Sequence, residues 1–329
     1  MSDPYLLLAS LLPSGPISAP PPVNLKALEN FRLWFNNAAF ASQISVVAQN
    51  SSPTVDPQQL EFSKTSGLNK IPRTNRIFIP APVNKPTPVS GSQLYQQRKQ
   101  ALKAGKLHTR LAPHSFGEIW SQATKQPSYQ EWKELLKREA QALSRGQGSN
   151  RLGILVGDSL SMWFPSELLP GGKFWLNQGI SGENSGQVLK RLGTFAATRP
   201  DTIYVLAGIN DLRQGATDDT ILSNIRSISR RLKQSHPDAE IVVQSILPTR
   251  NQAISNSRIR NLNQSIISIA QQEGVSYLNL YPLFLDQGGQ MKPELTTDGL
   301  HLNRQGYEVW QGAMEQAESW IALNRSTGY

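Results

Sequence analysis

Five short apolar runs recur in the second half of the chain, at residues 152–156, 174–177, 202–206, 240–245 and 275–278. A short, almost wholly apolar run is typical of a strand that is covered on both faces. Longer segments with apolar residues at three- and four-residue intervals separate these runs. Strands that alternate with helices predict an α/β domain with a parallel, doubly wound sheet.

Four amphipathic helices accompany the predicted strands. The first begins at the capping box Ser128-Tyr-Gln-Glu131, and Arg145-Gly146 is predicted to give it a cationic last turn and a left-handed end. Thr217 is the predicted cap of the second helix, and the last helix follows Asn303. The predicted buried faces are Tyr129, Trp132, Leu136 and Leu143; Ile221, Ile225, Ile228 and Leu232; Ile259, Leu262, Ile266 and Ile269; and Tyr307, Trp310, Met314, Ala317 and Ile321.

The first 90 residues have no comparable pattern. They contain 13 of the 22 prolines, which disfavour helix interiors and central strands. We therefore predict that residues 1–90 are largely disordered, apart from an amphipathic helix over 24–40. Residues 91–150 are predicted to form a basic helical extension, whose helix from Ser92 has a thin apolar stripe and is expected to be solvated. The α/β domain is predicted to span 151–323.

Charge divides the chain at the same place. Residues 1–150 carry 17 Lys and Arg against 8 Asp and Glu, whereas residues 151–329 carry 16 of each kind. This excess is compatible with weak contact of residues 1–150 with an anionic surface, without specific recognition of nucleic acid. The alternative is a solvated, disordered tail that binds nothing. No apolar run approaches the ~20 residues of a membrane span, and residues 5–12 lack a basic leader. We expect a cytoplasmic location, with a peripheral position at a membrane as the alternative.

Several classes of site are not predicted. Cysteine is absent from the sequence, which excludes disulfides, thiolate metal sites and a thiol nucleophile. Gly146-Gln-Gly148 precedes a strand instead of following one, Gly172-Lys173 is followed by Phe174, and no His-Glu-x-x-His occurs. We therefore expect no cofactor and no metal.

Polar residues directly follow the first strand. Gly157-Asp158-Ser159-Leu160 places a serine hydroxyl at the carboxyl edge of the sheet, where doubly wound sheets bind ligands and where a nucleophile is needed. The alternative is a turn serine that caps the next helix.

A serine nucleophile needs a base, and the chain has 4 histidines. His108 and His114 lie in the basic extension, and His236 lies at the end of a helix, where it would meet the helix dipole. His301 differs because Asp298 precedes it by three residues, so that the carboxylate can orient the ring and leave Nε2 to accept the serine proton. Capping of the last helix by Asp298 and His301 is the alternative.

Two further strand ends offer donors for an oxyanion. The glycines of Asn177-Gln-Gly-Ile-Ser-Gly182 leave backbone N–H groups uncovered, and Gly208-Ile-Asn210-Asp211 contains the side-chain amide of Asn210. Each stretch is also a common turn sequence.

Taken in order and in strand-end context, Gly157-Asp-Ser-Leu160, Gly182, Gly208-Ile-Asn210-Asp211 and Asp298-Gly-Leu-His301 resemble the four sequence blocks of the SGNH, or GDSL-type, serine esterases. The resemblance covers about residues 151–321 and implies a flavodoxin-like, three-layer α/β/α fold with strand order 2-1-3-4-5. It also implies that Ser159 is the nucleophile, His301 the general base and Asp298 its orienting carboxylate. The oxyanion would be held by the N–H groups of Ser159 and Gly182 and the amide of Asn210.

Three details are most similar to the branch that contains the platelet-activating-factor acetylhydrolase catalytic subunits. They are the short interval between Ser159 and Gly182, the Ile246-Leu-Pro-Thr-Arg250 stretch, and Leu302-Asn303 after His301. The resemblance implies a metal-free serine esterase that acts on small-molecule carboxylic esters.

The sequence specifies the substrate less closely than the type of reaction. We predict a preference for short acyl chains, because no long insertion that would build an acyl groove or lid lies between the blocks. Lysophospholipids and O-acetylated carbohydrates are alternative substrates. Trp163 and Phe164 are candidate pocket walls, with core packing as the alternative. The competing class is a non-enzymatic binding protein that uses its basic N-terminal region.

Overall fold

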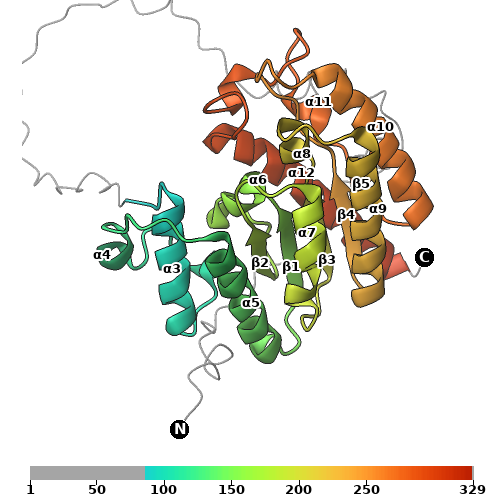
Figure 1. The fold of residues 1–329 in the computed structure, drawn as a ribbon. Helices are drawn as coiled ribbons and strands as arrows, with labels where there is room; N and C mark the ends of the chain where they lie inside the picture. Colours follow the sequence, from blue (N-terminus) through green and yellow to red (C-terminus); the bar gives the residue numbers. More distant parts are fainter. Residues whose placement is uncertain (1–85, 328–329) are drawn as a thin grey trace, which may run out of the picture.

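The computed structural model describes residues 86–327, which form an α/β domain preceded by a helical segment (Figure 1). The helix predicted over 24–40 lies outside the described residues. So does the region predicted to be disordered, residues 1–90, apart from residues 86–90, which precede α3. The helical segment contains α3 (Gly91–Lys103), the 3₁₀ turn η2 (His108–Arg110), α4 (Gly117–Trp120) and α5 (Tyr129–Gly146).

The domain that follows alternates strands and helices. Its strands are β1 (Leu152–Gly157), β2 (Phe174–Gly179), β3 (Thr202–Leu206), β4 (Glu240–Gln244) and β5 (Ser276–Leu278). Its helices are α6 (Ser159–Met162), α7 (Ser185–Arg191), α8 (Ile209–Arg213), α9 (Asp218–Ser235), α10 (Asn256–Glu273), α11 (Tyr281–Phe284) and α12 (Arg304–Thr327). Short 3₁₀ turns lie at η3 (Ser166–Leu168), η4 (Leu192–Phe195) and η5 (Pro293–Leu295).

The strands form one parallel sheet in the order β2-β1-β3-β4-β5, which confirms the doubly wound fold and the strand order that the resemblance implied. Each observed strand end lies within two residues of its predicted position. The largest difference is in β2, which continues to Gly179 because that residue pairs with Gly157. Pairing with a neighbouring strand cannot be read from the apolar pattern of one strand.

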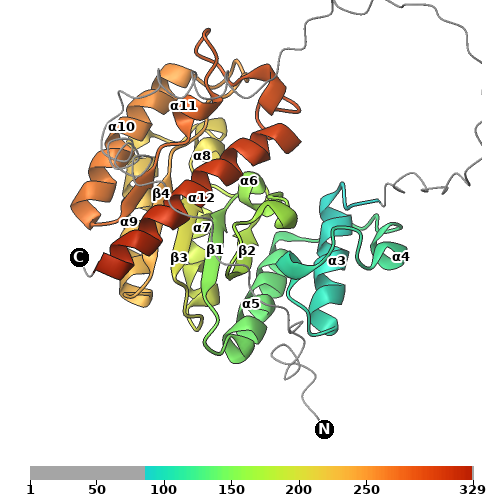
Figure 2. The ribbon, with the colours of Figure 1, turned by 180° about the vertical axis from the view of Figure 1, so that it is seen from behind.

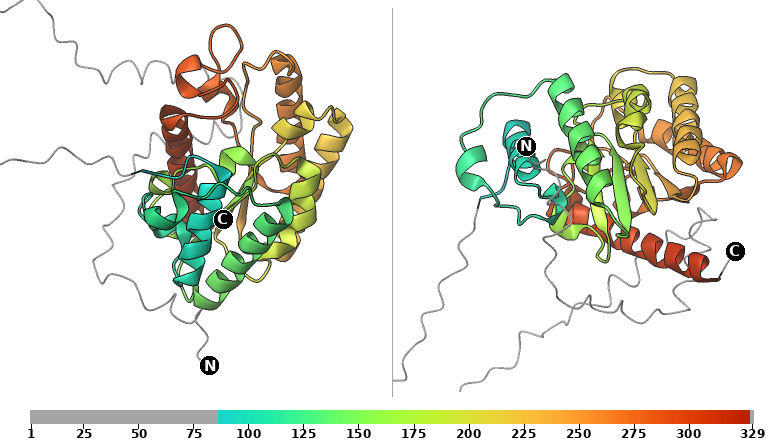
Figure 3. Two further views of the ribbon diagram at one scale, coloured as in Figure 1. Left: turned by 60° about the vertical axis from the view of Figure 1, so that its left-hand side comes forward. Right: turned by 90° about the horizontal axis from the view of Figure 1, so that it is seen from below.

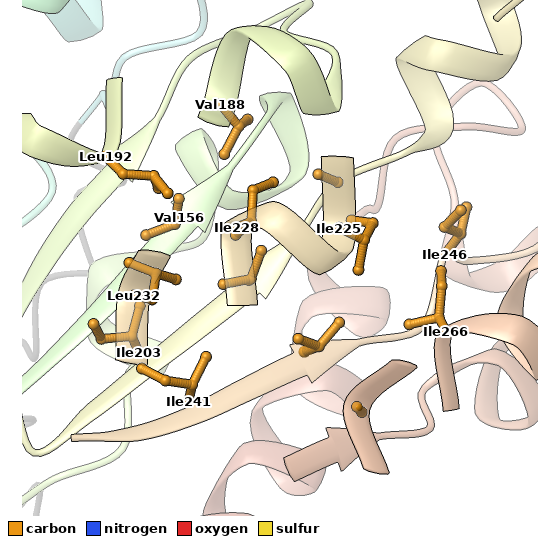
Figure 4. Close-up of a cluster of buried hydrophobic side chains, with 14 of the residues drawn as sticks. Val156, Val188, Leu192, Ile203, Ile225, Ile228, Leu232, Ile241, Ile246 and Ile266 are labelled. Carbon is orange, nitrogen blue, oxygen red and sulfur yellow. The ribbon is translucent and has the colours of Figure 1, made fainter. Parts of the chain in front are cut away.

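Two apolar cores sandwich the sheet, as expected for three layers. Ile154 and Val156 of β1 and Ile203 of β3 face the core beneath α7, α9 and α10 (Figure 4). Leu155 and Tyr204 face the opposite core, which α12 covers as it crosses the back of the sheet (Figure 2). Figure 3 shows the layers from below, with α12 on one side and the other long helices on the opposite side.

The predicted helical faces of the domain are buried. All the apolar residues predicted to point inward from α9, α10 and α12 have at most 6% of their surface exposed. Thr217 caps α9 by accepting a hydrogen bond from the N–H of Thr220, and α12 begins directly after Asn303. The three- and four-residue period therefore predicted both the type and the orientation of these helices.

Helix α5 differs from its prediction in two respects. Its capping box between Ser128 and Glu131 is present, but the left-handed residue is Gly148, with φ of +55°, and not Gly146. The last residue of α5 is Gly146, two residues before Gly148, and Gln147 between them has right-handed backbone angles. Trp132, Leu136 and Leu143 are buried as predicted, whereas Tyr129 is 39% exposed.

Helix α3 was expected to be a solvated basic helix, and this prediction was wrong. Leu94, Ala101 and Leu102 are buried, and so is Arg98, whose exposed fraction is 1%. The Arg98 guanidinium pairs with Glu139 of α5 and donates to the carbonyl of Asn177 in β2 at 2.7 Å. A buried cation needs such partners, and they come from residues 41 and 79 positions away. The division of the chain near residues 90 and 150 stays a prediction.

Candidate active site

The site is built at the carboxyl edge of the sheet, where β1 turns into α6. Gly157 ends the strand, and a Cβ atom there would lie 2.2 Å from the carbonyl oxygen of Leu206, so no larger residue fits without a shift. Asp158 caps α6 by accepting the N–H of Leu160 at 3.0 Å. This tight turn places Ser159 at the first position of α6, above the sheet (Figure 1).

A loop 142 residues further along brings a histidine to this serine. His301 Nε2 lies 3.1 Å from Ser159 Oγ, and His301 Nδ1 lies 2.7 Å from Asp298 Oδ2. The other carboxylate oxygen accepts the N–H groups of Leu300 and His301 at 3.0 and 2.7 Å. With Nδ1–H donated to Asp298, Nε2 is free to accept the serine proton.

The electrostatics of Asp298 suit a carboxylate that stays charged. Partial burial would raise its pKa, but the hydrogen bonds from the His301 ring and from the N–H groups of His301 and Leu300 outweigh burial and hold the pKa below the ordinary value. Asp298 and His301 keep 53% and 39% of their side-chain surface exposed, so the edge of the site is open to solvent.

Gly182 and Asn210 are linked to this site through residues next to them or to Ser159 in the sequence. Gly182 has φ of +81°, which favours glycine, and a Cβ atom there would meet nothing within 4 Å. The Asn210 amide nitrogen donates to the carbonyl of Glu183 at 3.0 Å and to Asp158 Oδ2 at 3.3 Å. Asn210 is thus hydrogen-bonded to Glu183, which follows Gly182 in the sequence, and to Asp158, which precedes Ser159.

Asp158 is completely buried beneath the serine. Burial raises its pKa to about 7, against the hydrogen bond from the N–H of Leu160 and the attraction of His301, which lower it. The nearby carboxylates of Glu183 and Asp211 raise it further. This carboxyl therefore changes its charge near neutral pH.

The sequence analysis did not predict an ion pair that connects the serine turn with the Gly182 loop. Glu183 and Arg191 are both buried, and Arg191 Nε donates to the Glu183 carboxylate at 2.7 Å. Arg191 Nη2 also donates to the carbonyl of Gly157 at 3.1 Å. The two side chains are eight positions apart across a loop and a helix start, so no regular period marks the pair.

A second missed residue is Asp211, the last member of the Gly208-Ile-Asn210-Asp211 stretch. It is buried, and it accepts hydrogen bonds from Ser185 N–H at 2.7 Å and Ser185 Oγ at 2.5 Å. These bonds hold the first turn of α7, just after the Gly182 loop. The signal was available, because an acidic residue that is beside Asn210, shortly after a strand, needs a donor once it is buried.

The remaining histidines do not contact Ser159. His108 Nε2 lies 3.3 Å from Gln97 Oε1 in the helical segment. His236 ends α9 as predicted, but it is buried and stacked on Phe195, with ring centroids 5.6 Å apart. Burial lowers its pKa, so the ring is neutral and does not meet the helix dipole as a cation.

The aromatic residues after the serine were candidate walls of a substrate pocket, and the structure gives them other contacts. Phe164 packs edge-on against Tyr307 and Trp310 in the core under α12. Trp163 is partly buried against two apolar clusters, the core under α12 and the cluster that contains Trp132 and Met162, and it does not line the hollow next to the site. That hollow is narrow and mainly apolar, and it is lined by Asp158, Leu160, Leu206, Ala207, Ile209, Ile246, Leu247, Pro248 and Leu300.

Within residues 86–327 no group of three or more His, Cys, Asp or Glu side chains is arranged to hold a metal ion. None of the helices in that range combines the length and the apolar character needed to cross a membrane.

A parallel α/β sheet with a serine, a histidine and an aspartate linked by hydrogen bonds at its carboxyl edge is the architecture of a serine hydrolase. Residues 143–309 match the model of the GDSL-like Lipase/Acylhydrolase family, and the chain belongs to that family. The chain is therefore a hydrolase of the SGNH, or GDSL, type that acts on ester bonds.

The chain is also similar to several individual proteins. Platelet-activating factor acetylhydrolase IB subunit alpha1 of Homo sapiens is 29% identical over 168 residues, which are 47% of this chain and 69% of the relative. N-acylneuraminate cytidylyltransferase of Streptococcus agalactiae is 24% identical over 158 residues, 48% of this chain and 36% of that protein. A solved structure described as a platelet activating factor from Streptococcus pneumonia is 27% identical, with a TM-score of 0.52, and the match covers 58% of this chain and 94% of that one.

Proposed function

We propose that this chain hydrolyses short-chain carboxylic esters through an acyl-enzyme intermediate on Ser159. The proposal rests above all on the hydrogen-bonded series from Ser159 Oγ to His301 Nε2 and from His301 Nδ1 to Asp298 Oδ2, at 3.1 and 2.7 Å. An ion pair of Asp298 with a helix-capping histidine would not require the serine to lie within hydrogen-bonding distance of the ring.

In this mechanism Ser159 Oγ attacks the ester carbonyl carbon while His301 Nε2 takes the hydroxyl proton. The resulting imidazolium is stabilised by Asp298, and it gives the proton to the departing alcohol when the carbon–oxygen bond breaks. Water then attacks the acyl-enzyme in the same way, which releases the acid and restores Ser159.

The oxyanion would be held by the N–H groups of Ser159 and Gly182 and by the amide of Asn210. One Asn210 hydrogen bond, to the carbonyl of Glu183, orients the amide. The contact with Asp158 is longer, at 3.3 Å, so an oxyanion would compete for that hydrogen.

A narrow hollow near the site supports the proposal of a small acyl group. Its lining includes Leu160, Ile209 and Leu300, which are the sequence neighbours of Ser159, Asn210 and His301 respectively. Its enclosed space holds about one water-sized group, comparable to an acetyl methyl. A long acyl chain would have to leave this hollow and lie along the surface.

Fluorophosphonate labelling tests the nucleophile without a choice of substrate. We expect the wild type to be labelled and Ser159→Ala to remain unlabelled, with His301→Ala labelled far more slowly because nucleophile and base act as a unit. A wild type that stays unlabelled while a known serine esterase reacts would favour the binding-protein alternative.

A series of p-nitrophenyl esters from acetate to palmitate tests the acyl preference. We expect the highest kcat/KM on acetate and a steep decline once the chain exceeds the hollow. Faster turnover on palmitate than on acetate would contradict the short-chain proposal and favour a lysophospholipase-type activity.

The basic excess supports a second, separate proposal. Within the described part of residues 1–150, Lys103, Lys106, Arg110, Lys125 and Lys137 are exposed. We propose that this region contacts an anionic surface weakly and that the protein works in the cytoplasm or at the periphery of a membrane.

A further inference from the structure

Tyr129, the first residue of α5, reaches the candidate active site from outside the part of the chain that matches the family. The match begins at residue 143, and Tyr129 precedes it. Its hydroxyl donates a hydrogen bond to Glu183 Oε1 at 2.9 Å, although its ring is 39% exposed. The capping box between Ser128 and Glu131 fixes the start of the helix and hence the position of this ring.

Glu183 is the residue through which this contact acts. It directly follows Gly182, and its own carbonyl accepts the Asn210 amide at 3.0 Å. Its carboxylate is buried and pairs with Arg191, which in turn donates to the carbonyl of Gly157, two residues before Ser159. One buried ion pair therefore connects the serine turn, the Gly182 loop and Asn210.

Tyr129 is the hydrogen-bond donor that reaches this ion pair from α5. A buried carboxylate is held in place by the donors around it, and here they are Arg191 and Tyr129. Burial and the neighbouring Glu183 carboxylate raise the pKa of the Tyr129 hydroxyl to about 12, so the group remains a donor at neutral pH.

Apolar packing at the same place also links the helical segment to the site. Trp132 and Leu136 of α5 and Leu94 of α3 form a cluster with Met162 and Ile180. Met162 belongs to the helix that begins with Ser159, and Ile180 lies two residues before Gly182. The contact of Tyr129 is thus made from a helix that is already firmly seated on both active-site turns.

We propose that Tyr129 is a positioning residue for the oxyanion site, acting through Glu183 on Gly182 and Asn210. The inference rests on the proposed function, since it assumes that Gly182 and Asn210 stabilise the oxyanion. It makes the helical segment before the family-matched region a part of the catalytic apparatus and not a detachable basic extension.

Tyr129→Phe tests the proposal with a minimal change, because it removes only the hydroxyl. We expect kcat on p-nitrophenyl acetate to fall about three- to tenfold, the usual effect of one lost hydrogen bond, with KM within about twofold of the wild type. The unfolding midpoint should change little, since the ring and the capping box remain. Unchanged kcat would overturn the proposal.

Tyr95→Phe is a matched control from the same segment. Tyr95 lies on α3 and packs edge-on against Trp132, with ring centroids 5.2 Å apart. It should keep wild-type kcat and fluorophosphonate labelling rates. If both variants lose activity in proportion to a lowered unfolding midpoint, Tyr129 has only a structural role and the proposal fails.

A double-mutant cycle with Asn210→Ala locates the effect. If Tyr129 acts by placing the oxyanion donors, Tyr129→Phe should lower kcat less in the Asn210→Ala background than in the wild type. Independent, multiplicative losses would contradict the proposed route. Fluorophosphonate labelling distinguishes failure of the proposed function from failure of this inference. No labelling of the wild type refutes the proposed function. Equal labelling rates of the wild type and Tyr129→Phe refute only the role of Tyr129.

Discussion

At the scale of single residues, the site depends on polar groups that are hydrogen-bonded to other residues of the chain before any substrate arrives. Asn210 shows this most clearly. Its amide nitrogen contacts the Glu183 carbonyl and Asp158, and its amide oxygen accepts a hydrogen bond from Arg213 at 3.1 Å. Such a group is preorganised, which is what an oxyanion donor requires.

Asn210→Ala should therefore lower kcat for p-nitrophenyl acetate by about 10²–10³ with little change in KM, the usual result of losing one oxyanion donor. Steady-state kinetics would measure both constants. A change confined to KM would show that Asn210 binds the ground-state substrate instead.

Asp158 gives a prediction for pH-dependent stability. Because burial raises its pKa from 3.8 to about 7 in the folded state, the folded protein keeps a proton that the unfolded chain has released. The contribution of Asp158 to the free energy of unfolding therefore falls as pH rises through this interval and levels off above it.

Asp158→Asn removes this titration and keeps an oxygen that can accept the N–H of Leu160. Relative to the wild type, the unfolding midpoint of the variant should rise by several degrees between about pH 5 and about pH 8. Thermal unfolding in matched buffers would measure it. A difference between the two proteins that does not depend on pH would show that Asp158 is not the titrating group.

At the scale of elements, α3 and α5 behave as parts of the domain. Arg98 of α3 is bonded to both α5 and β2, and α5 contributes Ala140 and Leu143 to the main core of the sheet. These contacts bury large apolar side chains that would be exposed if the helices were absent. We therefore expect the boundary of the stable unit to lie before α3.

Two truncations test this boundary. Removal of residues 1–85 should leave hydrolysis of a small soluble ester nearly unchanged. Removal of residues 1–145 should cost about 1.5–3 kcal/mol for each large buried side chain that loses its packing, so that the protein aggregates or melts early.

Leu136→Ala in the full chain provides the control for the longer truncation. It removes one buried side chain of α5 and should destabilise the protein by about 2–5 kcal/mol without removing any helix. Equal unfolding midpoints for the full chain and the 1–145 truncation would contradict a structural role for α5.

At the scale of the whole molecule, charge and chemistry are separated along the chain. The basic excess lies within residues 1–150, whereas Ser159, Gly182, Asn210, Asp298 and His301 all lie in the half with balanced charge. The proposed contact with an anionic surface should depend on salt, and the hydrolysis of a small neutral ester should not.

Co-sedimentation with anionic vesicles tests this separation. The full chain should bind them at low salt and dissociate at moderate salt, with neutral vesicles as the control and p-nitrophenyl acetate hydrolysis constant throughout. Equal recovery in the supernatant at both salt concentrations would refute the anionic-surface proposal without affecting the esterase proposal.

Much of the fold was predictable from the sequence because the apolar period reports burial directly. The strands at 152–157 and 202–206 and the helices α9, α10 and α12 follow from which positions are apolar. The candidate site was predictable where short motifs stand directly after strands, since the carboxyl ends of parallel strands meet at one edge. Ser159 and Asn210 were found in this way, whereas His301 was selected among the four histidines because Asp298 precedes it by three residues.

The tertiary structure alone decided which polar groups are buried together. Arg98 and Glu139 appear in the sequence as ordinary surface charges of a basic extension, and Glu183 and Arg191 have no periodic relation. Each pair becomes necessary only when folding removes water from around it, because a charge in the interior must find its partner among residues that are distant in the chain. The sequence by itself determined the layers and the strand-end motifs, whereas the folded chain determined how Tyr129 and Glu183 support them.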